Sequence, residues 1–288
     1  MISTGITIGD GPLTGVFDED VRSHEISETL FQALVMVNTG VWFIASLLSY
    51  FLARITLQPI KDTYELQEKF VADVAHELRT PLAVMKSASE MALRSERSNI
   101  EYKNFISDSL EEVDRLITIT SDLLFLLQHK FLNAREKESI DLSDIVHKSV
   151  ERIRMYAQER KISIVEEIQN KVFIRGVESD LQRLLSNVLK NALDYNIPDG
   201  SVQVALKREG TNVLLSISDT GIGMSESVRT RVFDRFYKAD IARMQKGSIG
   251  SGLGLSIVKE IIDTQGGTVI VASEVGKGST FTISLPCV

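Results

Sequence analysis

The chain has 288 residues, a formal net charge of −7, and 43% hydrophobic against 25% charged residues. This length allows about two domains. The acidic balance argues against a general nucleic-acid binder, which normally shows a basic patch. The single cysteine, Cys287, excludes an internal disulfide and a cysteine-based metal site. We therefore expect a globular protein in a reducing compartment, with no nucleic acid among its partners.

One segment has the composition of a membrane span. All 23 residues from 31 to 53 lack a formal charge. A helix of about 20 residues is long enough to cross a bilayer core. The 20 residues before this segment contain one Lys or Arg and the 20 after it contain three, which predicts that the C-terminal side is cytoplasmic. A buried core helix is the alternative, because Gln32 and Asn38 weaken the apolar signal.

The sequence thus predicts a single pass through a lipid bilayer, with an extracytoplasmic head at 1–30. About 30 residues are too few for an independent sensing domain. The head is therefore expected to be either the remnant of a sensor or a minimal input segment.

Two helical stretches follow the expected span. Apolar residues at alternating spacings of four and three run from Val71 to Ala92, and a second apolar stripe runs from Ile106 to Phe131. The second stripe is wider than one neighbouring helix can cover, so a homodimeric four-helix bundle is the simplest way to bury it. The sequence predicts a helical hairpin at 70–133 with a polar turn at 94–99.

The pattern changes after Ser139 and predicts an α+β sandwich at 139–288, with helices on one face of a sheet. A strand, a helix and a strand come first, followed by an amphipathic helix capped at Ser179 or Asp180. The remaining expected elements are, in chain order, a hairpin turning at Glu209-Gly210, a glycine-rich stretch at 247–254, a helix at 255–265 and a final hairpin.

The sequence "NVLKN" places Asn187 and Asn191 one turn apart, on one face of the amphipathic helix. Amide oxygens at this spacing can bind a hard cation such as Mg²⁺, while the amide N–H groups meet phosphate. By itself the pattern is a weak signal and is more typical of two solvated asparagines.

The sequence "DTGIG" follows an expected strand. Asp219 can accept a hydrogen bond from an exocyclic amine, and glycines at 221 and 223 allow the backbone to approach a flat ring. An ordinary Asp-containing turn is the alternative.

The stretch "GSIGSGLGLSIVK" brings several glycines directly before a helix, where backbone N–H groups can bind phosphate. It matches neither a P-loop nor a dinucleotide fingerprint, and a flexible hinge loop would explain it as well. The preceding "RVFDRFYKAD" supplies aromatic and basic side chains that could fold over a nucleotide.

His76 lies in "FVADVAHELRTPLAVMK", where it follows the seam residue Ala75 and is expected on the exposed flank of its helix. A lone helical histidine is usually structural, but a neutral imidazole can attack a phosphate. Thr80 shares its helix face, whereas adjacent Glu77 does not naturally face it. Pro81 lacks an N–H and favours a bend nearby.

Together, these motifs and the "HELRTP" helix resemble the sensor histidine kinases of two-component systems, over about residues 60–288. The ATP-binding half is similar to the Bergerat-type fold shared with gyrase and mismatch-repair ATPases. The resemblance implies an α+β multi-domain protein of a prokaryotic plasma (inner) membrane. It implies a signalling helix at 54–69, a dimerisation and phosphotransfer domain at 70–133, and a cytoplasmic catalytic ATP-binding domain at 139–288.

The resemblance also implies roles for individual residues. His76 would accept the phosphoryl group, with Glu77 as its acidic helper and Thr80 orienting water for dephosphorylation. ATP and Mg²⁺ are the implied cofactors, with Asn187 and Asn191 holding the metal. The implied nucleotide-binding residues are Asn187, Lys190, Asn191, Asp219, Gly221, Gly223, Phe233, Phe236, Lys238, Gly250, Gly252 and Gly254.

The implied function is autophosphorylation of His76 by ATP, transfer to an Asp of a response regulator receiver domain, and phosphatase action on that regulator. A catalytically silent receptor or scaffold, and an ATPase with a clamp role, are the alternatives. One departure bears on ATP binding. The sequence "NALDYN" places Asp194 where many members of the family carry a basic residue, so this acid either repels the triphosphate or turns away from it.

Overall fold

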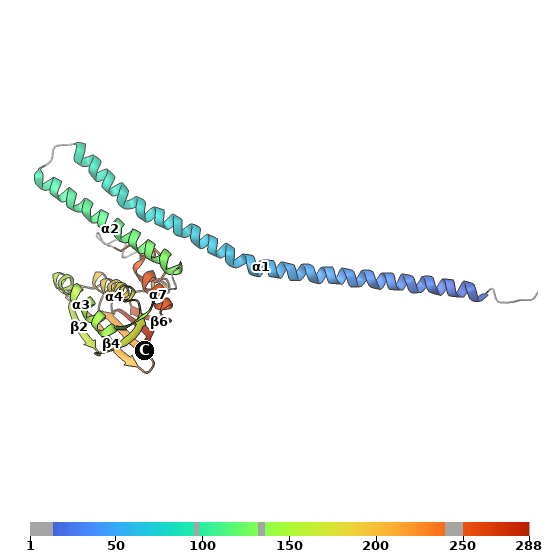
Figure 1. Ribbon diagram of the computed structural model, residues 1–288. Coiled ribbons are helices and arrows are strands. Elements are labelled where there is room, and N and C mark those ends of the chain that lie inside the picture. The colour runs from blue at the N-terminus through green and yellow to red at the C-terminus, as the bar shows by residue number, and fades with distance from the viewer. Residues whose placement is uncertain (1–13, 95–97, 132–135, 240–249, 288) are drawn as a thin grey trace, which may run out of the picture. The chain divides into compact units, whose positions relative to one another are not determined.

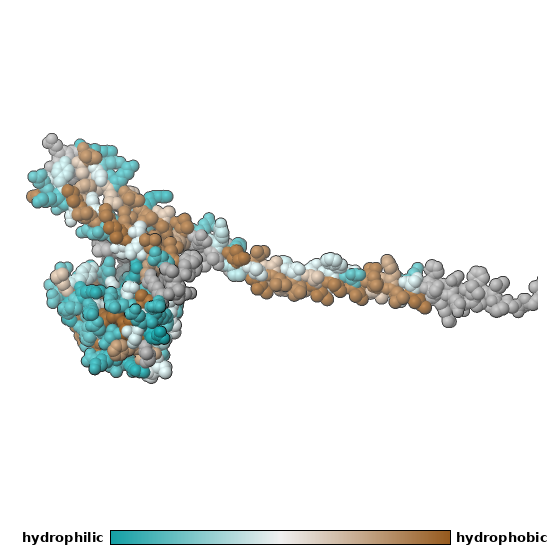
Figure 2. Space-filling model, in the orientation of Figure 1, coloured by the Kyte–Doolittle hydropathy of each residue, from teal (hydrophilic) through white to brown (hydrophobic). Residues whose placement is uncertain are grey.

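The computed structural model describes residues 14–94, 98–131, 136–239 and 250–287. The chain divides into two compact units, Met1–Lys69 and Phe70–Val288. Helix α1, Thr14–Arg94, begins in the first unit and ends in the second. Its Ile26–Lys61 stretch is long and apolar enough to cross a membrane, and its side chains are exposed (Figure 2). The described part of the chain therefore offers one candidate membrane span.

Helix α2, Asn99–Phe131, follows α1 after a short connection and runs back along the end of α1 (Figure 1). Its start is fixed by a capping box. The backbone N–H of Ser98 donates to Glu101 Oε2 at 2.8 Å, and Glu101 N donates to Ser98 Oγ at 3.3 Å. The sequence carries this capping signal, but only a polar connection was predicted at this point. Residues 95–97 lie outside the described residues.

The rest of the second unit is an α/β sandwich, which confirms the predicted fold class (Figure 1). Its five-stranded sheet has the order β2-β4-β5-β7-β6, in which only β2 and β4 pair in parallel. The strands are β2 Ser163–Ile168, β4 Ser201–Glu209, β5 Asn212–Asp219, β6 Thr268–Glu274 and β7 Gly278–Pro286.

Three amphipathic helices cover one face of this sheet (Figure 1). They are α3 Leu142–Glu159, α4 Glu178–Asp194 and α7 Gly254–Thr264. The core between the layers is built from aliphatic side chains at helical and alternating strand spacings, among them Leu184, Val188, Ile217, Ile257 and Ile283, all at most 1% exposed. This packing places the start of α7 beside α4, which matters for the site below.

Three elements differ from the sequence prediction. Helix α4 has Val177 at its N-cap, without a side-chain capping bond, so the predicted cap at Ser179 or Asp180 is wrong. Strand β3, Phe173–Gly176, pairs with β1, Glu138–Asp141, and was not predicted because four residues carry too little periodicity. The single turn α5, Glu226–Arg229, was missed for the same reason.

Candidate functional site

Helix α4 carries the two asparagines at the i and i+4 positions of one face, and both are half-buried. The side-chain nitrogen of Asn187 is buried and has no hydrogen-bond partner among the described residues. Gly254, the first residue of α7, lies against this asparagine, since a Cβ there would sit 3.2 Å from Asn187 Oδ1. An unpaired buried amide is costly, so this N–H group is suited to an anionic ligand such as phosphate.

The donor set at this point suits Mg²⁺ brought in with a triphosphate. The described residues contain no group of three or more His, Cys, Asp or Glu side chains that could hold a metal ion. Mg²⁺ commonly binds through few protein oxygens, together with water and substrate phosphates. The amide oxygens of Asn187 and Asn191 would meet that requirement.

Asp219 ends strand β5 and is only 8% exposed. Its Oδ1 accepts hydrogen bonds from the backbone N–H of Gly221 at 2.8 Å and of Ser279 at 3.2 Å. Burial raises the pKa of this carboxyl, and the two N–H groups oppose that rise. Its other oxygen, Oδ2, accepts no hydrogen bond from the described residues, so it can accept one from an amine such as that of adenine.

The glycines after Asp219 are required by the chain's own backbone. A Cβ on Gly221 would collide with the carbonyl of Tyr195, and one on Gly223, whose φ is +65°, would collide with the carbonyl of Glu274. The sequence predicted that a ligand ring would occupy the space beside these glycines. In the structure a large part of it is taken by neighbouring strands and by the end of α4, so these glycines shape the site from behind.

Phe236 and Gly252 lie on either side of residues 240–249 and contact each other through their backbones. Both have positive φ, +58° for Phe236 and +73° for Gly252. A Cβ on Gly252 would lie 2.8 Å from the carbonyl carbon of Phe236. A bulky residue rarely adopts such a φ and does so under strain. The strained contact therefore brings the two ends of the expected nucleotide lid together.

The other residues expected at the nucleotide site have different surroundings. Phe233 is half-buried against the core, whereas the space around the Cα of Gly250 is open. Lys190 is exposed on α4 and forms no ion pair with any residue that the structure describes. Gly247 lies outside the described residues. The structure thus places Gly254 against Asn187 and Gly252 against Phe236, whereas Lys190 has no ion-pair partner among the described residues.

Lys238 extends from the C-terminal α/β sandwich to helix α1. Its Nζ donates to Glu77 Oε2 at 2.7 Å, and the two side chains are only 16% and 20% exposed. Nearby, the ring of Phe236 contacts that of Phe70, with 6.0 Å between centroids. Glu77 is therefore oriented toward Lys238, and the role that the resemblance implies for Glu77 beside the imidazole requires this ion pair to open.

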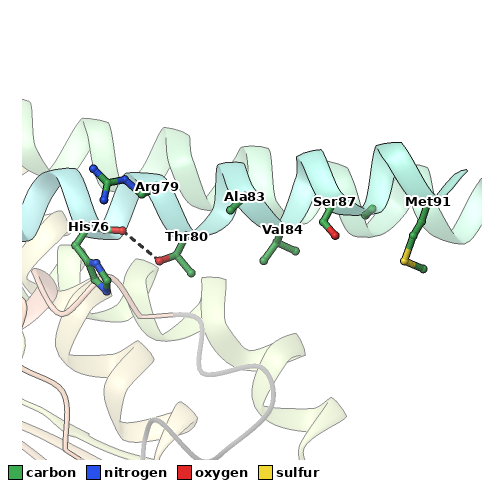
Figure 3. Close-up of a pocket in the computed structure, with 8 residues that line it drawn as sticks. His76, Arg79, Thr80, Ala83, Val84, Ser87 and Met91 are labelled. Carbon is green, nitrogen blue, oxygen red and sulfur yellow. Dashed lines mark hydrogen bonds between the residues drawn. The ribbon is translucent and has the colours of Figure 1, made fainter. Parts of the chain in front are cut away.

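His76 is exposed on α1, and its imidazole makes no hydrogen bond with a described residue. Thr80 Oγ1 donates to the carbonyl oxygen of His76 at 3.2 Å, and both side chains project from the same side of the helix (Figure 3). They border a groove of about 660 Å³ along this face of α1, lined by His76, Arg79, Thr80, Ala83, Val84, Ser87, Ala88 and Met91. The imidazole is thus open to a partner or a nucleotide.

The structure settles the direction of Asp194. Its Oδ1 accepts hydrogen bonds from Tyr156 Oη at 2.7 Å and from Arg160 at 2.9 Å, both on or just beyond α3. Burial, together with the hydrogen bond to Asp194, raises the pKa of Tyr156 to about 12. Asp194 therefore helps to hold α4 against α3. Its side chain is directed to Tyr156 and Arg160, so the structure gives no support for direct repulsion of a triphosphate.

Two regions of the chain match family models. Residues 66–131 match the His Kinase A (phospho-acceptor) domain, and residues 176–288 match the histidine kinase-, DNA gyrase B- and HSP90-like ATPase domain. The first contains His76, and the second contains the asparagine face, Asp219 and the glycine-rich stretch. Two independent matches thus fall on the two chemical sites in the expected order.

The chain is similar to several curated sensor proteins. It is 33% identical over 277 residues to sensor protein CiaH of Streptococcus pneumoniae, which covers 94% of this chain and 60% of CiaH. It is 35% identical over 231 residues to sensor histidine kinase CusS of Escherichia coli strain K12, which covers 80% of this chain and 48% of CusS. The chain therefore spans between about half and three-fifths of these relatives.

A solved structure shares the fold. Histidine kinase ThkA, in complex with response regulator protein TrrA, superposes with a TM-score of 0.63 at 19% identity, over 79% of this chain and 64% of that one. At this identity the likeness concerns the fold alone. Together with the two family models and the relatives above, the comparisons show that the chain belongs to the sensor histidine kinases of two-component systems.

Proposed function

We propose that the chain is an ATP-dependent protein-histidine kinase that phosphorylates itself on His76 and passes the phosphoryl group to an Asp of a response regulator. The observation that carries the proposal is the 2.7 Å contact between Lys238 and Glu77. It connects the lid of the nucleotide site to the residue that follows the nucleophile. An enzyme that transfers phosphate between these two domains needs such proximity.

The residues support a direct displacement. A lone pair of the His76 imidazole attacks the γ-phosphorus, the N–P bond forms, and the P–O bond breaks with its electron pair on the β-phosphate oxygen of ADP. Asp219 would hold the adenine amine, and the Asn187 amide would donate to phosphate. Mg²⁺ on the amide oxygens of Asn187 and Asn191 would neutralise part of the phosphate charge. Glu77, once released, would stabilise the positive imidazole.

The groove beside His76 suits the second transfer. In that step the carboxylate of an Asp attacks the phosphoryl group, an O–P bond forms, and the electron pair of the N–P bond returns to the imidazole. The ThkA complex supports this partner class, because it holds a response regulator protein. Thr80 lies on the same face as His76 (Figure 3). Its hydroxyl could orient a water molecule that hydrolyses the aspartyl phosphate of the regulator.

The same proposal includes a homodimer and a membrane. The apolar stripe of the hairpin is exposed in the single chain, as shown by Ile106 at 55%, Leu110 at 58%, Ile117 at 59% and Leu124 at 56%. A second copy would bury these side chains in a four-helix bundle. We further propose that residues 31–53 cross the plasma membrane of a prokaryote once, with the catalytic domains in the cytoplasm.

Labelling with γ-labelled ATP tests the proposal. The wild-type chain should acquire acid-labile, base-stable label, and His76→Gln should bind ATP normally but acquire none. His147→Gln is the matched control, since His147 is an exposed histidine of α3 that contacts Glu166. A wild type that binds no ATP would support a silent scaffold. ATP hydrolysis without label on the protein would support a clamp ATPase.

A further inference from the structure

We propose that Asp122, on helix α2 of the phosphoacceptor hairpin, is a positioning residue for the nucleotide site of the ATP-binding domain. The proposal rests on the proposed function, because it concerns the affinity of that site for ATP. It adds a residue from outside the ATP-binding domain to the construction of the site.

Asp122 is a buried charge with two partners on different elements. It is 7% exposed on a helix whose neighbouring polar side chains face solvent. Its Oδ1 accepts a hydrogen bond from the guanidinium of Arg183 at 2.6 Å, and its Oδ2 accepts one from Ser251 Oγ at 3.2 Å. A buried carboxylate is tolerated only when it is paired and hydrogen-bonded. Both oxygens are thus committed to the ATP-binding domain.

The contact with Ser251 reaches the glycine-rich stretch. Ser251 is 8% exposed and lies between Gly250 and Gly252. Its Oγ also accepts a hydrogen bond from the backbone N–H of Leu253 at 3.2 Å, at the residue before α7 begins. Asp122 therefore orients a hydroxyl that holds the turn leading into the helix start where phosphate is expected to bind.

The contact with Arg183 reaches the helix that carries the asparagines. Arg183 precedes Asn187 by four residues on α4, so the two side chains share a face. The guanidinium also stacks on the ring of Phe125, 4.4 Å from its centroid, and Phe125 lies on α2 near Asp122. A charged hydrogen bond and a stacking contact thus fix this part of α4 against α2.

Asp122 consequently ties the glycine-rich stretch and the asparagine helix to one carboxylate. These two elements meet where Gly254 faces Asn187 Oδ1, and their separation decides whether phosphate can contact both. Removing the charge should let them move apart without removing any residue that touches ATP. We expect weaker ATP binding with phosphoryl transfer at saturating ATP largely preserved, which is a KM effect rather than a kcat effect.

The test measures ATP binding by the full chain in detergent, in a His76→Gln background that prevents turnover. Asp122→Asn should raise the Kd for ATP about tenfold, equivalent to about 1.4 kcal/mol. Ser251→Ala, which removes only the hydroxyl and keeps the charge of Asp122, should raise it about threefold, because the Ser251–Asp122 contact of 3.2 Å is long. The double variant should be less than additive, because the two groups share a bond. Asp108→Asn, an exposed aspartate on α2, is the control and should bind like the parent.

A role limited to holding the domains together would lower the Tm of Asp122→Asn without nucleotide and leave the Kd of both variants unchanged. That result would overturn the inference and leave the proposed function intact. If Asp122→Asn fails to fold, an unchanged Kd for Ser251→Ala overturns it alone. A parent chain that binds no ATP at all would overturn the proposed function and this inference together.

Discussion

Lys238 and Glu77 are 161 positions apart in the chain, yet the Nζ of one lies 2.7 Å from Oε2 of the other. In the reaction, Lys238 is expected to bind the phosphates and Glu77 to stabilise the imidazole of His76. While the two side chains are paired with each other, neither is fully available for its expected role. A triphosphate carries more negative charge than one carboxylate and would compete for Lys238. Nucleotide binding and release of Glu77 are therefore expected to be coupled.

This coupling makes opposite predictions for affinity and rate. In Glu77→Gln the neutral amide holds Lys238 less strongly, so ATP should bind more tightly, by about threefold. Autophosphorylation at saturating ATP should be slower, because the acidic helper is lost. Equilibrium binding and single-turnover labelling measure the two effects. Glu111→Gln, an exposed glutamate on α2, should change neither, and weaker ATP binding by Glu77→Gln would contradict the coupling.

Thr80→Ala should separate the kinase activity from the phosphatase activity. The hydroxyl is exposed and bonds only the carbonyl of His76 among the described residues, so its loss should cost little stability. Labelling of His76 should proceed at the wild-type rate, whereas dephosphorylation of the response regulator should slow. Thr118→Ala is a close control, since Thr118 is exposed on α2 and makes the same bond, to Asp114 O at 2.9 Å. Equal phosphatase rates for Thr80→Ala and wild type would defeat the assignment.

Patterns within one element predicted most of the fold and the chemistry. The spacing of Asn187 and Asn191 fixed their common helix face, and the alternation before Asp219 placed it at a strand end, because helix and strand periodicity determine these directions locally. His76 on the exposed flank followed from the seam in the same way. Such relationships require no knowledge of the partner element.

Contacts across elements could not be predicted in this way. Asp122 meets partners 61 and 129 positions away, and its sequence neighbours carry no sign of that environment. Asp194 illustrates the same limit. Its spacing from Asn191 allowed a position near the phosphates, and the choice was made by Tyr156 and Arg160 on the neighbouring element. Helical geometry predicts the direction in which a side chain projects, but not which group of a neighbouring element it contacts.

The environment of Asp194 changes what its substitution should do. A lysine there would lose the hydrogen bond from Tyr156 and face Arg160, so Asp194→Lys should lower the free energy of unfolding by about 1–3 kcal/mol. The Kd for ATP should stay near the wild-type value. Thermal unfolding with and without ATP measures both quantities. Glu159→Lys, an exposed charge reversal on α3, controls for net charge, and a markedly tighter Kd for Asp194→Lys would show that this acid does act on the triphosphate.

Asp219→Asn should separate recognition of adenine from stability. The asparagine oxygen can still accept from the N–H groups of Gly221 and Ser279, but its NH₂ group then takes the place of Oδ2 and cannot accept a hydrogen bond from the adenine amine. ATP should therefore bind about tenfold or more weakly, in the range of a hydrogen bond to a charged group. Competition between ATP and GTP should also become less selective, since the adenine amine is the group that Asp219 would read.

The pH dependence of stability provides the independent check on the same variant. Burial raises the pKa of Asp219 in the folded state, so the folded chain holds this proton more tightly than the unfolded chain. Its contribution to the free energy of unfolding is then fully present below the unfolded pKa and is lost as pH rises through the folded pKa. The asparagine of Asp219→Asn does not ionise, so the variant loses no stability at this position as the pH rises. The stability of the variant relative to wild type should therefore increase as the pH rises above about 4, the usual pKa of an unfolded Asp. A variant that instead becomes relatively less stable over this range would show that the buried carboxylate is stabilised by its two N–H donors more than it is destabilised by burial.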